Sequence, residues 1–97
     1  MTDLFNTIKA RSEAPGAFPR TLAEFKMRGD SATEPGAVVL RDFGPDHHDA
    51  NRYVTHLRVD YRDQPRPGYS SGHYFDDLRE AVTDYSERKQ RNRAFAA

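Results

Sequence analysis

The segment 51–61, NRYVTHLRVDY, alternates between two sets of side chains, one mainly apolar and one mainly polar. One set consists of Tyr53, Thr55, Leu57, Val59 and Tyr61. The other set consists of Arg52, Val54, His56, Arg58 and Asp60. A period of two residues is typical of a β-strand that buries one face and exposes the other. The segment therefore predicts a half-buried antiparallel strand whose outer face is open to solvent or to a partner.

Two further segments predict strands in the same sheet. Residues 37–43, AVVLRDF, are rich in strand-forming residues and are bounded by Gly36 and Gly44. Residues 69–75, YSSGHYF, follow a loop in which Pro65 and Pro67 cannot donate hydrogen bonds to a strand ladder. The three segments together predict an antiparallel sheet.

Three segments predict helices. Residues 76–91 begin with a capping aspartate and carry a stripe made by Leu78, Ala81, Val82 and Tyr85. Residues 2–11 form a second, shorter helix, with Thr2 as its cap. Residues 20–30 form a third, because Thr21 and Glu24 have the spacing of a capping box and Gly29 suits a helix end. Residues 92–97 are expected to be a frayed end.

These elements predict one α+β domain spanning residues 1–97. In this architecture, the C-terminal helix covers one face of a three-stranded antiparallel sheet, and two short N-terminal helices pack beside it. Leu57 and Leu78 are expected to be core contacts between the central strand and that helix.

Composition limits the size of the core and the choice of partner. Hydrophobic residues make up 36 % of 97 residues, and so small a core favours completion by a protein partner or a second copy of the chain. The formal net charge is zero, which argues against a general electrostatic grip on nucleic acid. The absence of cysteine excludes disulfides and thiolate chemistry. No signal peptide and no apolar run of about 20 residues is present, so we expect a cytoplasmic protein that does not bind membranes.

The segment 44–56, GPDHHDANRYVTH, gathers three histidines. We interpret it as a polar loop that runs into a strand, since Gly44, Pro45 and Asp46 favour a turn. It is expected to hold no metal and no cofactor, because it lacks the spacing of a known zinc motif. The alternative is a metal-dependent enzyme that uses Asp46, His47, His48, Asp49, His56 and His73.

Other catalytic constellations are equally weak. The carboxylates of residues 76–87 are expected on the polar face of a helix, where nothing shifts their pKa. Ser71 and His73 would share a face of a strand, but the chain offers no nucleophile motif and no nucleotide-binding motif. We therefore predict a binding protein and no enzyme.

Two groups of residues are candidates for partner binding. The outer strand face and the loop at 61–69 offer tyrosine and arginine, which are enriched at protein interfaces. These candidates are Arg58, Tyr61, Arg62, Arg66 and Tyr69. The alternative is a nucleic-acid-binding protein that contacts phosphates through the basic C-terminal helix. Its candidates are Arg88, Lys89, Arg91 and Arg93.

Residues 72–91, GHYFDDLREAVTDYSERKQR, place a short aromatic strand directly before a capped helix. This ending resembles that of small accessory proteins of bacterial plasmids, phages and integrative elements. The resemblance implies a small cytosolic protein that binds components of the host or of the element, such as an inhibitor of a host defence system. It implies no catalytic residues.

Overall fold

The computed structural model describes residues 3–47 and 51–97 as an α+β fold. The first helix, α1, spans Leu4–Glu13 and precedes β1 at Arg20–Met27 and β2 at Gly36–Asp42. The strands β3 at Tyr53–Val59 and β4 at Gly68–Phe75 follow. The chain ends with α2 at Leu78–Arg91 and a 3₁₀ turn at Arg93–Phe95. The α+β class is confirmed, but the sheet has four strands and one N-terminal helix precedes it.

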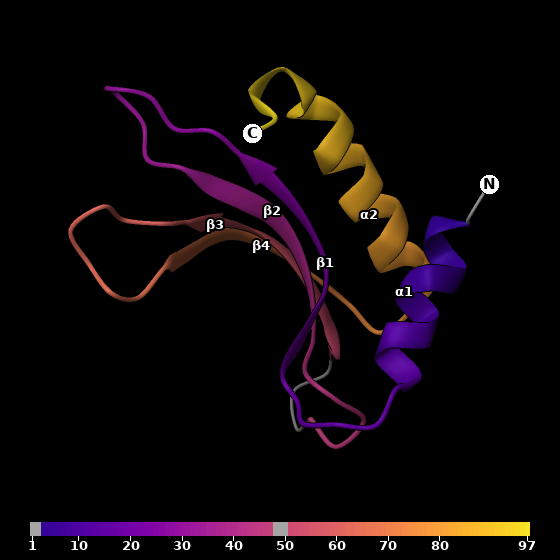
Figure 1. Ribbon diagram of the computed structural model, residues 1–97. Coiled ribbons are helices and arrows are strands. Elements are labelled where there is room, and N and C mark those ends of the chain that lie inside the picture. Colours follow the sequence, from indigo (N-terminus) through magenta and orange to yellow (C-terminus); the bar gives the residue numbers. More distant parts are fainter. Residues whose placement is uncertain (1–2, 48–50) are drawn as a thin grey trace.

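The four strands form an antiparallel meander in the order β1-β2-β3-β4. Each strand pairs with its neighbour in sequence; Val39 lies opposite His56, and Thr55 lies opposite His73. Both helices lie on one side of this sheet (Figure 1). Among the described residues, no helix covers the other side, and β1 and β4 are the two edge strands.

The helix predicted over residues 20–30 is wrong, because these residues form β1. The register shifts between Thr21 and Ala23, so a β-bulge interrupts the period of two. Leu22 and Phe25 therefore both reach the core at a spacing that mimics one helical turn. Glu24 caps no helix; it forms an ion pair with Arg58 on β3.

Gly29 is not a helix terminus either, but part of the loop that joins β1 to β2. A Cβ atom at Gly29 would lie 2.4 Å from the backbone nitrogen of Pro35. The two arms of this hairpin loop approach so closely that only glycine fits between them.

The C-terminal residues, predicted to fray, are attached to the sheet. The amide of Arg28 donates to the carbonyl of Phe95 at 2.9 Å, and the amide of Ala97 donates to the carbonyl of Lys26 at 3.0 Å. Ala96 and Met27 form an isolated antiparallel bridge. This segment covers part of the outer edge of β1 and leaves β4 as the more open edge.

Both helices begin at aspartates. Asp3 caps α1 by accepting a hydrogen bond from the amide of Phe5, while the predicted cap, Thr2, lies outside the described residues. Asp77 caps α2 by accepting from the amide of Arg79. The predicted stripe of α2 is confirmed, since Ala81, Val82 and Tyr85 are buried against the sheet and Leu78 flanks them.

The core lies between the sheet and the helices. Its buried members are Ile8, Leu22, Ala23, Val38, Leu40, Tyr53, Ala81, Val82 and Tyr85. Leu57 and Leu78 do contact this core as predicted, but both are only partly buried. The strongest hydrophobic contacts are therefore made by Ile8, Leu22 and Leu40, which are fully buried.

A buried carboxylate joins α1 to the sheet. Asp42 on β2 is fully buried and accepts hydrogen bonds from Ser12 at 2.7 Å, from the amide of Gly44 at 2.8 Å, and from Arg52 at 2.7 and 3.0 Å. Burial alone would raise the pKa of Asp42, but the hydrogen bonds from Arg52, Ser12 and Gly44 outweigh it and lower the pKa. This network is structural, because both carboxylate oxygens are satisfied within the fold.

Of the described helices, none is long and apolar enough to cross a membrane.

Candidate functional site

The side of the sheet opposite the helices carries a surface of aromatic side chains around one arginine. Arg41 of β2 lies opposite Val54 of β3, and Phe43, directly after β2, lines the same cavity as Val54 and His56. Tyr69 and Tyr74 of β4 lie opposite Arg58 and Val54, on the same side. We call Arg41, Phe43, Val54, His56, Tyr69 and Tyr74 the aromatic face.

The expected wet outer face of β3 is only partly correct, because Val54 and His56 are buried with exposures of 3 % and 8 %. Since no helix of the described ranges lies on this side, we infer that neighbouring long side chains cover them. The ring of Tyr69 stacks on His56 with a centroid distance of 4.7 Å. Tyr69 and Tyr74 themselves stay exposed, at 46 % and 62 %.

Arg41 is the charged centre of the aromatic face. Its guanidinium carbon lies 4.9 Å from the ring centroid of Tyr69 and 5.1 Å from that of Phe43, within cation–π distance of both. Among residues 3–47 and 51–97, no carboxylate forms an ion pair with Arg41. The aromatic face therefore presents a positive charge that the described part of the fold does not neutralise.

His56 stays uncharged at neutral pH. Burial, together with the positive charges of Arg41 and Arg88, lowers the pKa of His56 from 6.5 to about 4. Its Nε2 atom is buried and has no hydrogen-bond partner among the described residues. A buried nitrogen without a hydrogen-bond partner is costly, and covering side chains would have to move before a ligand could reach it.

A cavity of about 230 Å³ opens in the aromatic face. It is lined by Phe43, His47, Asn51, Val54, His56 and Tyr74. The lining is mainly apolar, with His56 and Asn51 as polar groups that could orient a ligand.

The candidates on the predicted partner surface separate into two roles. Arg58 donates to Asp60 at 2.8 and 3.0 Å and also pairs with Glu24, so it links β3 to β1. Arg62 donates to the carbonyls of Asp30 and Thr33 at 2.5 and 2.7 Å, so it connects the two hairpin loops. Both arginines are engaged within the fold.

The remaining three candidates are more available. Tyr61 is 40 % exposed, and its ring lies against Gly68 at the base of the loop. Arg66 is exposed at the tip of the same loop. Tyr69 belongs to the aromatic face, whereas Arg41, Phe43 and Tyr74 extend that face beyond the residues that sequence reasoning selected. Arg41 and Tyr74 lie on this face because both pair with Val54, from β2 and from β4. These pairings depend on strand register, which the sequence leaves open.

The basic C-terminal residues do not form one exposed cluster. Arg88 is only 4 % exposed, lies 3.3 Å from Asp84 and donates to the carbonyl of Ser71. Lys89 lies over the ring of Phe25 at 5.9 Å. Arg91 and Arg93 are exposed. The cations left for a nucleic acid on α2 are therefore fewer than the sequence indicated.

The three histidines that the structure describes, His47, His56 and His73, do not converge. His47 lies in a turn with its ring 5.0 Å from that of Phe43, while His48 and Asp49 lie outside the described residues. His56 belongs to the aromatic face, whereas His73 faces α2. Within the part of the chain that the structure describes, no group of three or more histidine, aspartate or glutamate side chains could hold a metal ion.

A polar cluster between β3, β4 and α2 was missed by the sequence interpretation. Asp84 was expected on a solvated helix face, but it accepts from Thr55 and contacts Nδ1 of His73 at 3.0 Å. Burial raises the pKa of Asp84, yet the hydrogen bonds from Thr55 and His73 and the charges of His73 and Arg88 lower it overall. Asp84 also pairs with Arg88 four residues later, and this i, i+4 spacing was the signal available in the sequence.

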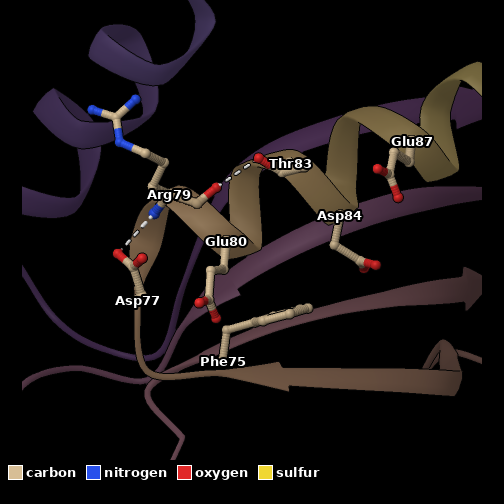
Figure 2. Close-up of a pocket in the computed structure, with 7 residues that line it drawn as sticks. All are labelled: Phe75, Asp77, Arg79, Glu80, Thr83, Asp84 and Glu87. Atoms are coloured by element: carbon tan, nitrogen blue, oxygen red, sulfur yellow. Dashed lines mark hydrogen bonds between the residues drawn. The ribbon is translucent and has the colours of Figure 1, made fainter.

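Beside this cluster, a groove of about 370 Å³ runs between α2 and the end of β4. Figure 2 shows Glu80, Asp84 and Glu87 on α2 along this groove, with the ring of Phe75 below them. Asp77 and Arg79, at its other end, are joined by the helix-capping hydrogen bond. The groove is acidic and solvent-accessible, so it can attract cations but holds no converging set of ligands among its described residues.

Ser71 and His73 do not form the shared strand face that their spacing predicts. Ser71 has a φ of 55° and lies where the register of β3 and β4 shifts, so it is the site of a bulge. No arrangement of a nucleophile with a base follows from this geometry.

Comparison of this chain with protein-family models, with curated proteins and with solved structures gives no match.

Proposed function

We propose that this chain is a small non-enzymatic binding protein that docks a protein partner on the aromatic face. The observation that carries the proposal is a sheet face that neither described helix covers, on which Tyr69 and Tyr74 are exposed and Arg41 lies over the ring of Tyr69. Tyrosine and arginine provide large contact areas and dominate the binding energy of many protein interfaces.

The way in which the side chains are held also supports binding. Tyr69 stacks on His56 and lies within cation–π distance of Arg41, so the exposed part of its ring is already oriented. A side chain that is ordered before binding loses less conformational entropy when the complex forms. The β3–β4 loop extends this surface, with Tyr61 and Arg66 as its exposed residues. Arg58 and Arg62 hold this surface in place.

The biological setting follows from the resemblance of residues 72–91. It supports a cytoplasmic accessory protein of a bacterial or phage mobile element that binds a host component, with inhibition of a host defence system as one such role. If the partner is a second copy of this chain, the aromatic face would be the interface of a homodimer.

The alternative is nucleic-acid binding through the C-terminal helix. Lys89, Arg91 and Arg93 favour it, because cations at a helix end can contact phosphates. The aromatic face lies on the opposite side of the sheet from α2, so one single strand cannot readily stack on it and contact these cations together. We therefore rank protein binding first.

Capture from a lysate of the native host, read by quantitative mass spectrometry, tests the proposal. A Tyr69→Ala, Tyr74→Ala variant should lose the protein that the wild type enriches. The matched control is Phe95→Ala, which removes another exposed aromatic ring, 54 % exposed, from the helix side. Circular dichroism must show that all variants are folded.

Two outcomes would overturn the proposal. One is a captured protein that is retained by the tyrosine variant and lost by the control. The other is salt-dependent binding of a labelled single-stranded oligonucleotide that disappears when Lys89, Arg91 and Arg93 are changed to glutamine.

A further inference from the structure

The cavity of the aromatic face has the size of one aromatic side chain. Its volume is about 230 Å³. An apolar cavity of about 150 Å³ is enough to bind benzene. Phe43, Val54 and Tyr74 form apolar walls against which a ring can pack.

Charge at the border of the cavity indicates what should accompany the ring. Arg41 lies over Phe43, which lines the cavity, and over Tyr69, which stacks on His56. Its guanidinium has the planar geometry that matches a carboxylate, and no carboxylate of the described residues occupies it.

Other cations of this side of the sheet do have partners. Arg58 is paired with Glu24 and Asp60, and Lys26 lies 3.8 Å from Glu24. The positive charge is therefore concentrated at Arg41, next to the cavity. His56, whose buried Nε2 has no hydrogen-bond partner among the described residues, also lines the cavity.

We propose that the cavity binds an aromatic side chain of a partner protein that is flanked by carboxylates, with the ring inside the cavity and a carboxylate on Arg41. This inference rests on the proposed function and specifies the chemistry of the partner segment: acidic and aromatic.

NMR titration with short peptides tests this inference. The probe is an acetylated and amidated heptapeptide of glycine and serine with one tyrosine between two aspartates. It should shift the ring signals of His56 and Tyr74 saturably. A second peptide with lysines in place of the aspartates, and a third with alanine in place of the tyrosine, should each bind about tenfold more weakly, as expected for the loss of one charge-assisted contact or one buried ring.

Two variants identify the charge that is responsible. Arg41→Gln should weaken the binding of the acidic peptide about tenfold. It should also remove the preference for the aspartate peptide over the lysine peptide. Arg79→Gln is the control, because it makes the same substitution on α2, away from the cavity. It should change neither the affinity for the acidic peptide nor the preference for aspartate. Thermal melting shows whether Arg41→Gln remains folded, and Arg41→Lys, which keeps the charge, should retain part of the preference.

The inference is overturned if the acidic peptide causes no saturable shift, if the lysine peptide binds equally well, or if folded Arg41→Gln keeps the preference. Its failure is distinguishable from that of the proposed function. A partner protein whose capture depends on Tyr69 and Tyr74, combined with no peptide binding, would reject only the acidic–aromatic chemistry. Specific peptide binding without such a partner would reject only the docking of a protein in that host.

Discussion

Asp42 and His56 are both buried in the sheet, and a charge on either must be compensated within the fold. Asp42 stays charged because Ser12, Arg52 and the amide of Gly44 all donate to it. His56 has Arg41 and Arg88 as charged neighbours, and the loss of its proton removes the conflict. Burial removes the hydration of a charge in both places. Hydrogen bonds compensate for this loss at Asp42, whereas His56 avoids it by remaining uncharged.

Asp42→Asn should strongly destabilise the protein. The substitution keeps the shape of the side chain but leaves Arg52 without its carboxylate in a part-buried position. Breaking a fully buried ion pair costs about 3–5 kcal/mol, and we expect a smaller loss here because Arg52 is 29 % exposed and can be partly hydrated. Urea denaturation at neutral pH measures the change; as a control, Asp63→Asn in the exposed loop should have little effect. Equal midpoints for the two variants would contradict the structural role of Asp42.

Because of His56, the free energy of unfolding should decrease as the pH falls from about 6.5 to about 4. Its folded pKa is about 4, below the ordinary value of 6.5, so in this window the unfolded chain binds the proton and the folded chain does not. The stabilisation is complete above pH 6.5 and decreases toward pH 4, by on the order of 3 kcal/mol.

Urea denaturation across this pH range checks the expectation by comparing the wild type with His56→Phe, which keeps the stacked ring. The variant should lose this part of the pH dependence. Asp42 and Asp84, whose folded pKa values are lowered, lose their contribution only at more acidic pH. The same slope for both proteins between pH 6.5 and 4 would refute the assignment.

At the scale of elements, two bulges change what the strands present. The bulge in β1 brings Leu22 and Phe25 to the same side. Two core residues of a strand therefore lie three positions apart, a spacing that is typical of a helix. The bulge in β4 places Ser71 at a φ of 55°, and its carbonyl accepts from Arg88. A bulge of this kind interrupts the open edge of β4, which makes pairing with a strand of another chain less favourable.

Gly29→Ala should destabilise the β1–β2 hairpin. The added Cβ would lie 2.4 Å from Pro35 N and 2.7 Å from the carbonyl oxygen of Thr33, and both are backbone atoms that cannot rotate away. We expect a loss on the order of 2 kcal/mol or more, detected as a lower melting temperature. Ser31→Ala in the same loop is the control and should melt like the wild type. An unchanged melting temperature for Gly29→Ala would mean that the backbone at Gly29 has room for a Cβ atom beside Pro35.

At the scale of the whole molecule, one side of the sheet carries the core and the other carries the candidate interface. Both helices pack on the core side, where the fully buried Ile8, Leu22 and Leu40 lie. The other side buries Val39 and Val54 beneath the side chains of the sheet itself. Because both described helices pack on the core side, the other face of the sheet carries no helix among the described residues, and it is the face on which we propose that a partner docks.

Leu22→Ala should therefore be more destabilising than Leu78→Ala. Leu22 is fully buried, so its loss should cost about 2–5 kcal/mol, whereas the partly buried Leu78 loses less apolar contact. Chemical denaturation of the two variants gives the comparison. A larger loss for Leu78→Ala would place the centre of the core at the start of α2 instead of against β1.

The candidate site was predictable only in part. Tyr69 was selected from the sequence because tyrosine is typical of interfaces. Arg41, Phe43 and Tyr74 were not, because they come from different strands and meet only through the register of β2, β3 and β4. His73 and Asp84 were likewise read separately, although a strand and a helix bring them to 3.0 Å from each other.

The sequence by itself determined the elements whose local residue pattern is typical of their type: β2, β3, β4, α2 and most of α1. In α2, and on the core side of β3, neighbouring residues already show which face is buried, since the period of the apolar side chains equals that of the backbone. The tertiary structure alone decided that residues 20–27 form β1, because pairing with β2 outweighs the helix-like spacing that the bulge creates. It also decided that Ala96 pairs with Met27 and that Arg88 is buried, because both depend on contacts between residues far apart in the chain.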